Sequence, residues 1–289
     1  MFSRNINSPD QITQFNRELQ ENSTVPLFLC VDEEGGMVAR LANHPNFSLP
    51  QYKSAAAVGK SGNPDDARNM GKAIGEYLRE FGFNVDFAPV ADVNTNPNNP
   101  VIGTRAFSSD PETAALMAGA MADGLRQSGI MPVFKHFPGH GDTQKDSHVG
   151  IAVTSKSADE MKVCEWIPFQ KASESDGIMV GHLAAPQITG DLTPATMSGQ
   201  MIAILKEQLG FQGLIITDSL SMGAVTDSYD FASAAVSAFQ AGCDILLMPE
   251  DYREAFDGIL SAVENGTITQ QELDEKVLHI LKRKEFMGL

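Results

Sequence analysis

The sequence has few cysteines, few cationic side chains and no long apolar run, and each shortage excludes a class of protein. Its three cysteines, among 289 residues, are an odd and widely spaced set. Such a set predicts free thiols in a reducing compartment rather than a disulfide framework. Lysine and arginine total 21 against 37 acidic residues, and the formal net charge is −16. This charge repels phosphate backbones and anionic lipids, so we expect no nucleic-acid and no membrane partner.

Targeting and membrane signals are also missing. No apolar stretch approaches the ~20 residues that cross a bilayer, and the first ten residues lack the apolar centre of a secretory signal. We therefore expect a cytoplasmic protein. Because 42% of the residues are apolar, the chain can bury a sizeable core. We expect one domain over residues 1–289.

Apolar strands and amphipathic helices alternate along the chain. Short apolar runs predict buried strands at 25–31, 84–90, 130–134, 177–180, 214–217 and 244–248. Helical periodicity and capping residues predict helices at 8–22, 64–81, 111–129, 157–173, 198–209, 231–240, 251–264 and 270–286. This alternation indicates a parallel sheet covered by helices, as in a (β/α)₈ barrel or a doubly wound sheet.

Polar side chains follow the predicted strands where each strand ends. These residues are Asp32, Asp92, Lys135 with His136, His182 and Asp218. The carboxyl ends of parallel strands form the binding face in both candidate folds. No glycine-rich dinucleotide fingerprint or phosphate-binding loop follows a strand, which disfavours nucleotide ligands. Of the three adjacent acids at 32–34, we expect at least one to be solvated.

The densest polar stretch is 135–148, whose prolines and glycines rule out a continuous helix or strand. Three interpretations stay open. The first is a polar surface loop. The second is an acid/base dyad in which Asp146 accepts the ring N–H of His148 and orients it. The third is a metal site, which would use His140, Asp142, Asp146 and His148.

Five segments at these strand ends resemble family 3 glycoside hydrolases, and most of all the bacterial β-N-acetylhexosaminidase branch. They are 31–36, 84–92, 103–108, 135–148 and 216–222. The segments occur in the family's order and cover nearly the whole chain, and the 135–148 block is highly specific. The resemblance implies a single (β/α)₈ TIM-barrel-like domain that needs no metal and no organic cofactor.

The resemblance also implies roles for individual residues. Asp218 is the expected nucleophile, which forms a covalent glycosyl-enzyme with net retention. Taken alone, Asp218 would instead be read as the N-cap of a helix at 219–224. His148 is the expected acid/base, with Asp146 as its orienting partner. The residues expected to bind the sugar are Asp32, Arg40, Arg105, Lys135 and His136.

The substrate implied by the resemblance is an N-acetylglucosamine-containing muropeptide, met during peptidoglycan recycling. Two features depart from the family pattern. Met37 stands where members of the branch often have Arg, which removes a cation near the expected sugar pocket. Family members also carry a further segment before the part that matches Met1. We therefore expect a truncated first barrel strand or a gap that a partner fills.

Four rival functions stay open. A phosphorylase would use the same site, because a neutral His148 does not repel phosphate. A non-catalytic sugar-binding protein would keep the pocket without turnover. A β-glucosidase is disfavoured by the loop at 146–148, since glucosidase branches usually place a Glu acid/base in another domain. A metal hydrolase would lose activity with a chelator.

Overall fold

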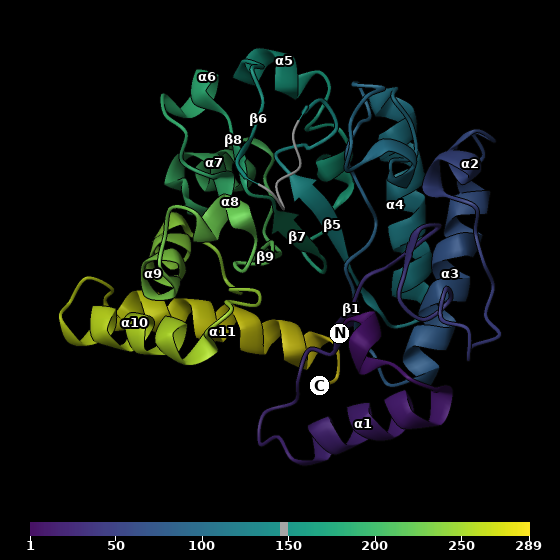
Figure 1. Ribbon diagram of the computed structural model, residues 1–289, viewed down its shortest axis with the longest axis horizontal. Coiled ribbons are helices and arrows are strands. Elements are labelled where there is room, and N and C mark those ends of the chain that lie inside the picture. Colours follow the sequence, from purple (N-terminus) through teal and green to yellow (C-terminus); the bar gives the residue numbers. More distant parts are fainter. Residues whose placement is uncertain (145–149) are drawn as a thin grey trace.

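The computed structural model describes residues 1–144 and 150–289. Its centre is a five-stranded parallel sheet that curls into a half-barrel (Figure 1). The strand order is β1-β4-β5-β7-β9. The bounds are Cys30–Val31 for β1, Val85–Asp86 for β4, Met131–Phe137 for β5, Gly177–Val180 for β7 and Leu214–Thr217 for β9. All four pairings are parallel, so the strands end at one common edge.

Helices pack around this sheet. The longer ones are α1 (Pro9–Glu21), α3 (Pro64–Glu80), α4 (Pro111–Gln127), α9 (Phe231–Ala241), α10 (Tyr252–Glu264) and α11 (Gln270–Phe286). Shorter ones are α2 (Ala55–Gly59), α5 (Ala158–Lys162), α6 (Pro186–Thr189), α7 (Gly199–Ala203), which a π-helical turn continues over Ile204–Gln208, and α8 (Gly223–Thr226). Two small sheets pair β2 (Glu33–Gly35) with β3 (Val38–Ala39) and β6 (Ala152–Val153) with β8 (Leu183–Ala184).

Local sequence signals account for where several helices begin. A proline occupies the first turn of α1, α3 and α4, where its missing N–H costs no hydrogen bond. The side chains of Ser8, Asn63 and Asp110 accept backbone N–H groups at the N-caps of these helices. Helix α11 begins with a capping box between Thr269 and Glu272.

The helices α3 and α4 stand side by side along the sheet (Figure 1). Small residues let their backbones approach closely. A Cβ at Gly71 would lie 2.1 Å from the carbonyl oxygen of Met121, and one at Gly124 would lie 2.1 Å from that of Arg68. The apolar inner face of the sheet forms a separate cluster that includes Val85, Phe87, Met131, Val133, Met179, Leu214 and Ile216. No helix in the described part of the chain is long and apolar enough to cross a membrane.

Several predicted elements differ in the structure. The predicted strand 25–31 shortens to Cys30–Val31, and the predicted strand 130–134 extends to Phe137, so it includes Lys135 and His136. The predicted helix 157–173 is wrong, because it breaks into α5 and a 3₁₀ turn at Pro168–Lys171. In a continuous helix the Pro168 ring would clash with the carbonyl of Cys164. The predicted strand 84–90 shortens to Val85–Asp86, followed by one bridge between Val90 and Lys135. Pro89 has no N–H to extend that ladder.

Another difference lies at the far edge of the sheet. The predicted strand 244–248 makes a single bridge, between Ile216 and Ile245. Within residues 1–144 and 150–289 the sheet therefore has five strands rather than the eight of a closed barrel. The parallel sheet with its helices is nevertheless of the expected α/β, TIM-barrel-like kind. The truncated first strand stays a prediction.

Candidate active site

The predicted site residues that the structure describes come together at the carboxyl end of the sheet. They line one cavity of about 620 Å³. Asp32 follows β1, Arg40 follows β3, Arg105 ends a 3₁₀ turn at Gly103–Arg105, Lys135 and His136 belong to β5, and Asp218 follows β9. Asp146 and His148 lie outside the described residues. Their acid/base role therefore stays a prediction.

A chain of ion pairs with alternating charge runs along the cavity wall. The Nη2 atom of Arg40 lies 3.7 Å from Asp32 Oδ2, and Lys135 Nζ donates to Asp32 Oδ1 at 2.7 Å. The same ammonium group is 2.7 Å from Glu34 Oε1. Arg105 completes the chain with two hydrogen bonds to the Glu34 carboxylate. Alternating donors and acceptors of this kind suit the hydroxyl and amide oxygens of a sugar.

Burial and neighbouring charges shift the pKa values of Glu34 and Lys135 in opposite directions, and the charges have the larger effect. Burial acts to raise the pKa of Glu34, but the charges of Lys135 and Arg105 hold that pKa at about 2. Burial acts to lower the pKa of Lys135, but Asp32 and Glu34 raise it above its ordinary value. Glu34 and Lys135 are therefore both charged at neutral pH.

Asp92 holds two histidines of the 135–148 stretch. Its Oδ1 accepts the backbone N–H of His140 at 2.6 Å, and its Oδ2 lies 2.7 Å from His136 Nδ1. Burial acts to raise the pKa of Asp92, but the His136 charge and its hydrogen bond lower it on balance. An ionised carboxylate can only accept a hydrogen bond, so Nδ1 of His136 carries a proton and donates a hydrogen bond to Asp92. Thr143 Oγ1 lies 2.7 Å from His140 Nδ1.

Asp218 sits in a turn that is fixed on both sides. Its backbone N–H donates to Val180 O at 2.8 Å, and its Oδ1 accepts the Ser219 N–H at 2.7 Å. Burial acts to raise the pKa of Asp218, but the imidazoles of His136 and His182 and the Ser219 N–H lower it on balance. The carboxylate is therefore ionised at neutral pH, as a nucleophile requires. The N-cap interpretation is wrong, because α8 begins after Met222.

His182 hydrogen-bonds to this turn. Its Nε2 donates to Ser219 O at 2.8 Å, and its Nδ1 lies 2.8 Å from Thr196 Oγ1. The imidazole is fully buried. The strand-end pattern pointed to His182 and Asp92 but gave neither of them a role.

Glu34 lines the cavity but is not among the predicted site residues. The only sequence signal for it is its place in the run of three acids at 32–34. Glu33 and Glu34 are buried, whereas the Asp32 side chain is 21% exposed and lines the cavity, so of the three acids only Asp32 is open to solvent. Glu33 accepts the backbone N–H groups of Leu41 and Ala42. Met37 is 72% exposed and is not among the residues that line the cavity. Its difference from Arg therefore changes the surface rather than the cavity wall.

Metal binding has no support among the described residues, in which no group of three or more His, Cys, Asp or Glu side chains is placed to hold an ion. Of the predicted metal set, Asp146 and His148 are outside this part of the chain. The other two residues of that set, His140 and Asp142, are described and have protein partners. Asp142 Oδ2 accepts the hydroxyl of Thr154, and His140 contacts Thr143.

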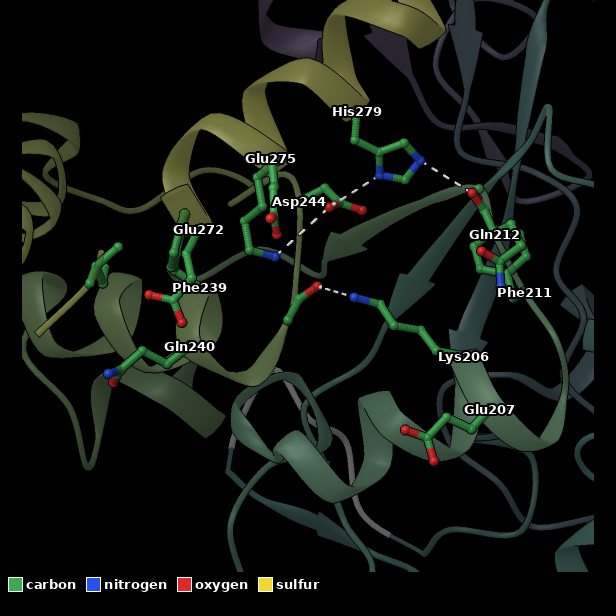
Figure 2. Close-up of a pocket in the computed structure, with 14 residues that line it drawn as sticks. Lys206, Glu207, Phe211, Gln212, Phe239, Gln240, Asp244, Glu272, Glu275 and His279 are labelled. Atoms are coloured by element: carbon green, nitrogen blue, oxygen red, sulfur yellow. Dashed lines mark hydrogen bonds and ion pairs between the residues drawn. The ribbon is translucent and has the colours of Figure 1, made fainter. Parts of the chain in front are cut away.

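A second cavity, of about 780 Å³, opens at the amino end of the sheet between α9, α11 and the loop before β9 (Figure 2). Lys206 and Lys276 donate to the consecutive carbonyls of residues 242 and 243, which end α9. Nδ1 of His279 lies 3.4 Å from Asp244 Oδ1. Figure 2 shows Lys206 donating to a backbone carbonyl at the end of α9, and His279 beside Asp244. The cations of this cavity therefore bind the end of a helix and a neighbouring carboxylate, which gives them a structural explanation.

Comparison with known proteins agrees with this site. The sequence profile described as "Glycosyl hydrolase family 3 N terminal domain" matches residues 1–283. Beta-hexosaminidase A from Pseudoalteromonas piscicida is 34% identical over 98% of this chain and 52% of its own length. The chain thus spans about half of that relative.

Solved structures give the same result. A glycoside hydrolase family 3 beta-N-acetylglucosaminidase from Paenibacillus sp. str. FPU-7 superposes with a TM-score of 0.93 and 34% identity, over 100% of this chain and 56% of that one. Beta-glucoside phosphorylase BglX superposes with a TM-score of 0.90 and 27% identity, over 97% of this chain and 52% of that one. The resemblance read from the sequence is confirmed, and the chain belongs to the family of glycosyl hydrolase family 3 N-terminal domains.

Proposed function

We propose that residues 1–289 act as one catalytic domain, a retaining exo-β-N-acetylglucosaminidase that removes terminal N-acetylglucosamine from peptidoglycan fragments. The observation that carries the proposal is that a half-buried, ionised Asp218 lines the same cavity as the chain of ion pairs formed by Asp32, Lys135, Glu34 and Arg105. Two similar proteins bear names that agree, the P. piscicida hexosaminidase and the Paenibacillus beta-N-acetylglucosaminidase.

The proposed reaction has two steps. In the first, a carboxylate oxygen of Asp218 attacks the anomeric carbon, and His148 gives its proton to the departing oxygen as the glycosidic bond breaks. In the second, His148 takes a proton from water, which attacks the anomeric carbon and releases Asp218. Two inversions give a product with the starting β configuration.

The charged wall has a distinct task in this proposal. Asp32 lines the cavity and accepts hydrogen bonds from sugar hydroxyls, while Arg105 and Lys135 donate to hydroxyl or acetamido oxygens. Arg40 makes the longest contact in the chain of ion pairs, 3.7 Å to Asp32, and its partly exposed side chain adds positive charge beside that carboxylate. His136, held by Asp92, presents its ring to the same cavity.

The test is release of 4-nitrophenol from 4-nitrophenyl N-acetyl-β-D-glucosaminide. Wild type should turn over, and Asp218→Ala and His148→Ala should each lose most of kcat while keeping wild-type circular dichroism. Azide should partly rescue Asp218→Ala by attacking in place of the carboxylate, which gives the α-azide. Folded variants that keep the wild-type rate would overturn the assignment.

A phosphorylase is the second candidate, and the superposition on BglX favours it. Phosphate would take the place of water in the second step, because a neutral His148 carries no negative charge to repel it. The two are separated by product analysis in phosphate buffer. N-acetylglucosamine supports the hydrolase, and N-acetylglucosamine 1-phosphate supports the phosphorylase. A folded protein that binds the sugar but releases neither product is a non-catalytic binding protein.

A further inference from the structure

Glu34 lies between two of the cations that line the cavity. Its side chain is 2% exposed. Its Oε1 accepts from Arg105 Nη2 at 2.7 Å and lies 2.7 Å from Lys135 Nζ, while its Oε2 accepts from Arg105 Nε at 2.8 Å. Both oxygens are therefore taken by protein cations. Glu34 differs in this from Asp32, whose Oδ2 makes one ion pair within residues 1–144 and 150–289, the 3.7 Å contact with Arg40.

The bonds of Arg105 show which of its donors are left. A guanidinium carries five N–H groups in one plane, and each terminal nitrogen has two of them. Arg105 uses Nε and Nη2 side-on against Glu34, and Nη1 donates to Val101 O at 3.1 Å. One N–H on each terminal nitrogen therefore has no bond within residues 1–144 and 150–289.

Lys135 gives a similar result. An ammonium group has three N–H donors. One points to Asp32 and one to Glu34, both at 2.7 Å, which leaves one. Because Arg105 and Lys135 both line the cavity, the remaining donors of the two side chains are those that a bound sugar can use.

We propose that Glu34 is a positioning residue that orients Arg105 and Lys135 so that their remaining donors converge on one hydroxyl group of the sugar, at C3, C4 or C6. The proposal rests on the proposed function of the cavity. Arg and Lys side chains have many rotamers, and fixing them before binding removes that entropic cost from substrate recognition. Without Glu34, two neighbouring buried cations would repel each other and turn away.

The test compares Glu34→Gln with a matched control, Glu33→Gln. Glu33 is the preceding residue of β2 and is equally buried, but its carboxylate bonds to the backbone of residues 41 and 42 and to Tyr77. It does not line the cavity. Glu33→Gln therefore measures how far the loss of a buried carboxylate in β2 affects activity through the fold alone.

The readout is kcat/KM for the parent 4-nitrophenyl substrate and for its 3-deoxy, 4-deoxy and 6-deoxy analogues. Glu34→Gln should lower kcat/KM for the parent about 10- to 100-fold, the effect of losing charge-assisted hydrogen bonds. With at least one analogue, the one that lacks the oxygen bound by Arg105 and Lys135, Glu34→Gln should lower kcat/KM by less than about threefold. Glu33→Gln should affect all four substrates by the same factor.

An equal loss on all four substrates for Glu34→Gln would overturn the proposal, because a purely structural role predicts it. Glu34→Asp serves if the amide variant does not fold. It keeps the charge but draws the carboxylate back by one methylene, and the same selective loss is expected. If wild type hydrolyses none of the substrates, the proposed function fails by itself. Glu34 is then tested by calorimetric binding of N-acetylglucosamine and its deoxy analogues, where the same selectivity supports the proposal and uniform weakening or no binding overturns it.

Discussion

The ion pairs of Glu34 predict a stability that depends on pH with a definite sign. Its folded-state pKa is about 2, against an ordinary 4.5, after the charges of Lys135 and Arg105 outweigh burial. A depressed carboxyl pKa contributes stability above the unfolded value, and this is lost as pH falls through the folded value. The difference corresponds to about 3 kcal/mol at neutral pH. It should decline between about pH 4.5 and pH 2.

Urea unfolding of wild type and Glu34→Gln, followed by circular dichroism from pH 7 to pH 3, measures this contribution. The stability gap between the two proteins should be about 3 kcal/mol at pH 7 and should narrow steadily towards pH 3. Removing one member of a buried ion pair costs a similar amount in other proteins, about 3–5 kcal/mol.

Glu33→Gln is a control of opposite sign. Burial raises the pKa of Glu33, and its hydrogen bonds only partly offset this. A raised carboxyl pKa means that folding favours the protonated form, so the stability it contributes is present at low pH and declines as pH rises. The gap between wild type and Glu33→Gln should therefore widen as pH falls. Gaps that change in the same direction for both variants would refute the electrostatic reasoning.

Three further predictions address the site and the fold. Asp92→Asn should lower kcat/KM about tenfold or more and shift its pH profile, because the amide has no charge beside the His136 ring and one oxygen in place of the two that accept from His136 and His140; an unchanged profile would contradict this. Gly71→Ala should lower the free energy of unfolding, measured in urea, by at least about 1–3 kcal/mol, because its Cβ would lie 2.1 Å from Met121 O. Gly199→Ala has open space around the new Cβ and should leave the stability unchanged or raise it slightly. EDTA should leave the rate of 4-nitrophenol release unchanged, and inactivation that zinc restores would favour the metal hydrolase.

The sequence predicted helices better than strands. Helix 270–286 has the predicted bounds, and 111–129 and 64–81 differ by one or two residues at their ends. Caps and prolines are local signals, so neighbouring residues suffice to place these ends. Where a strand begins and ends depends on which distant segment pairs with it, and the local sequence does not indicate that pairing. The segment 244–248 has the composition of a strand yet makes one bridge.

The position of the site followed from the fold class, and its roles came from the family resemblance. Residues after parallel strands meet at one edge, so Asp32, Lys135 and Asp218 were expected to lie together. Whether a carboxylate is solvated or paired depends on distant partners. Glu34 pairs with Arg105, 71 residues away, and no local pattern distinguishes it from its neighbour Glu33.

The central claim is that Asp218 forms a covalent bond to the sugar. The most direct test is to incubate the protein with 5-fluoro-N-acetylglucosaminyl fluoride, whose ring fluorine slows the second step more than the first, and to measure its intact mass. We predict an increase of one fluorosugar residue, which peptide mapping places on Asp218 and which Asp218→Ala does not show. Turnover without an adduct, or an adduct on another residue, would contradict the account.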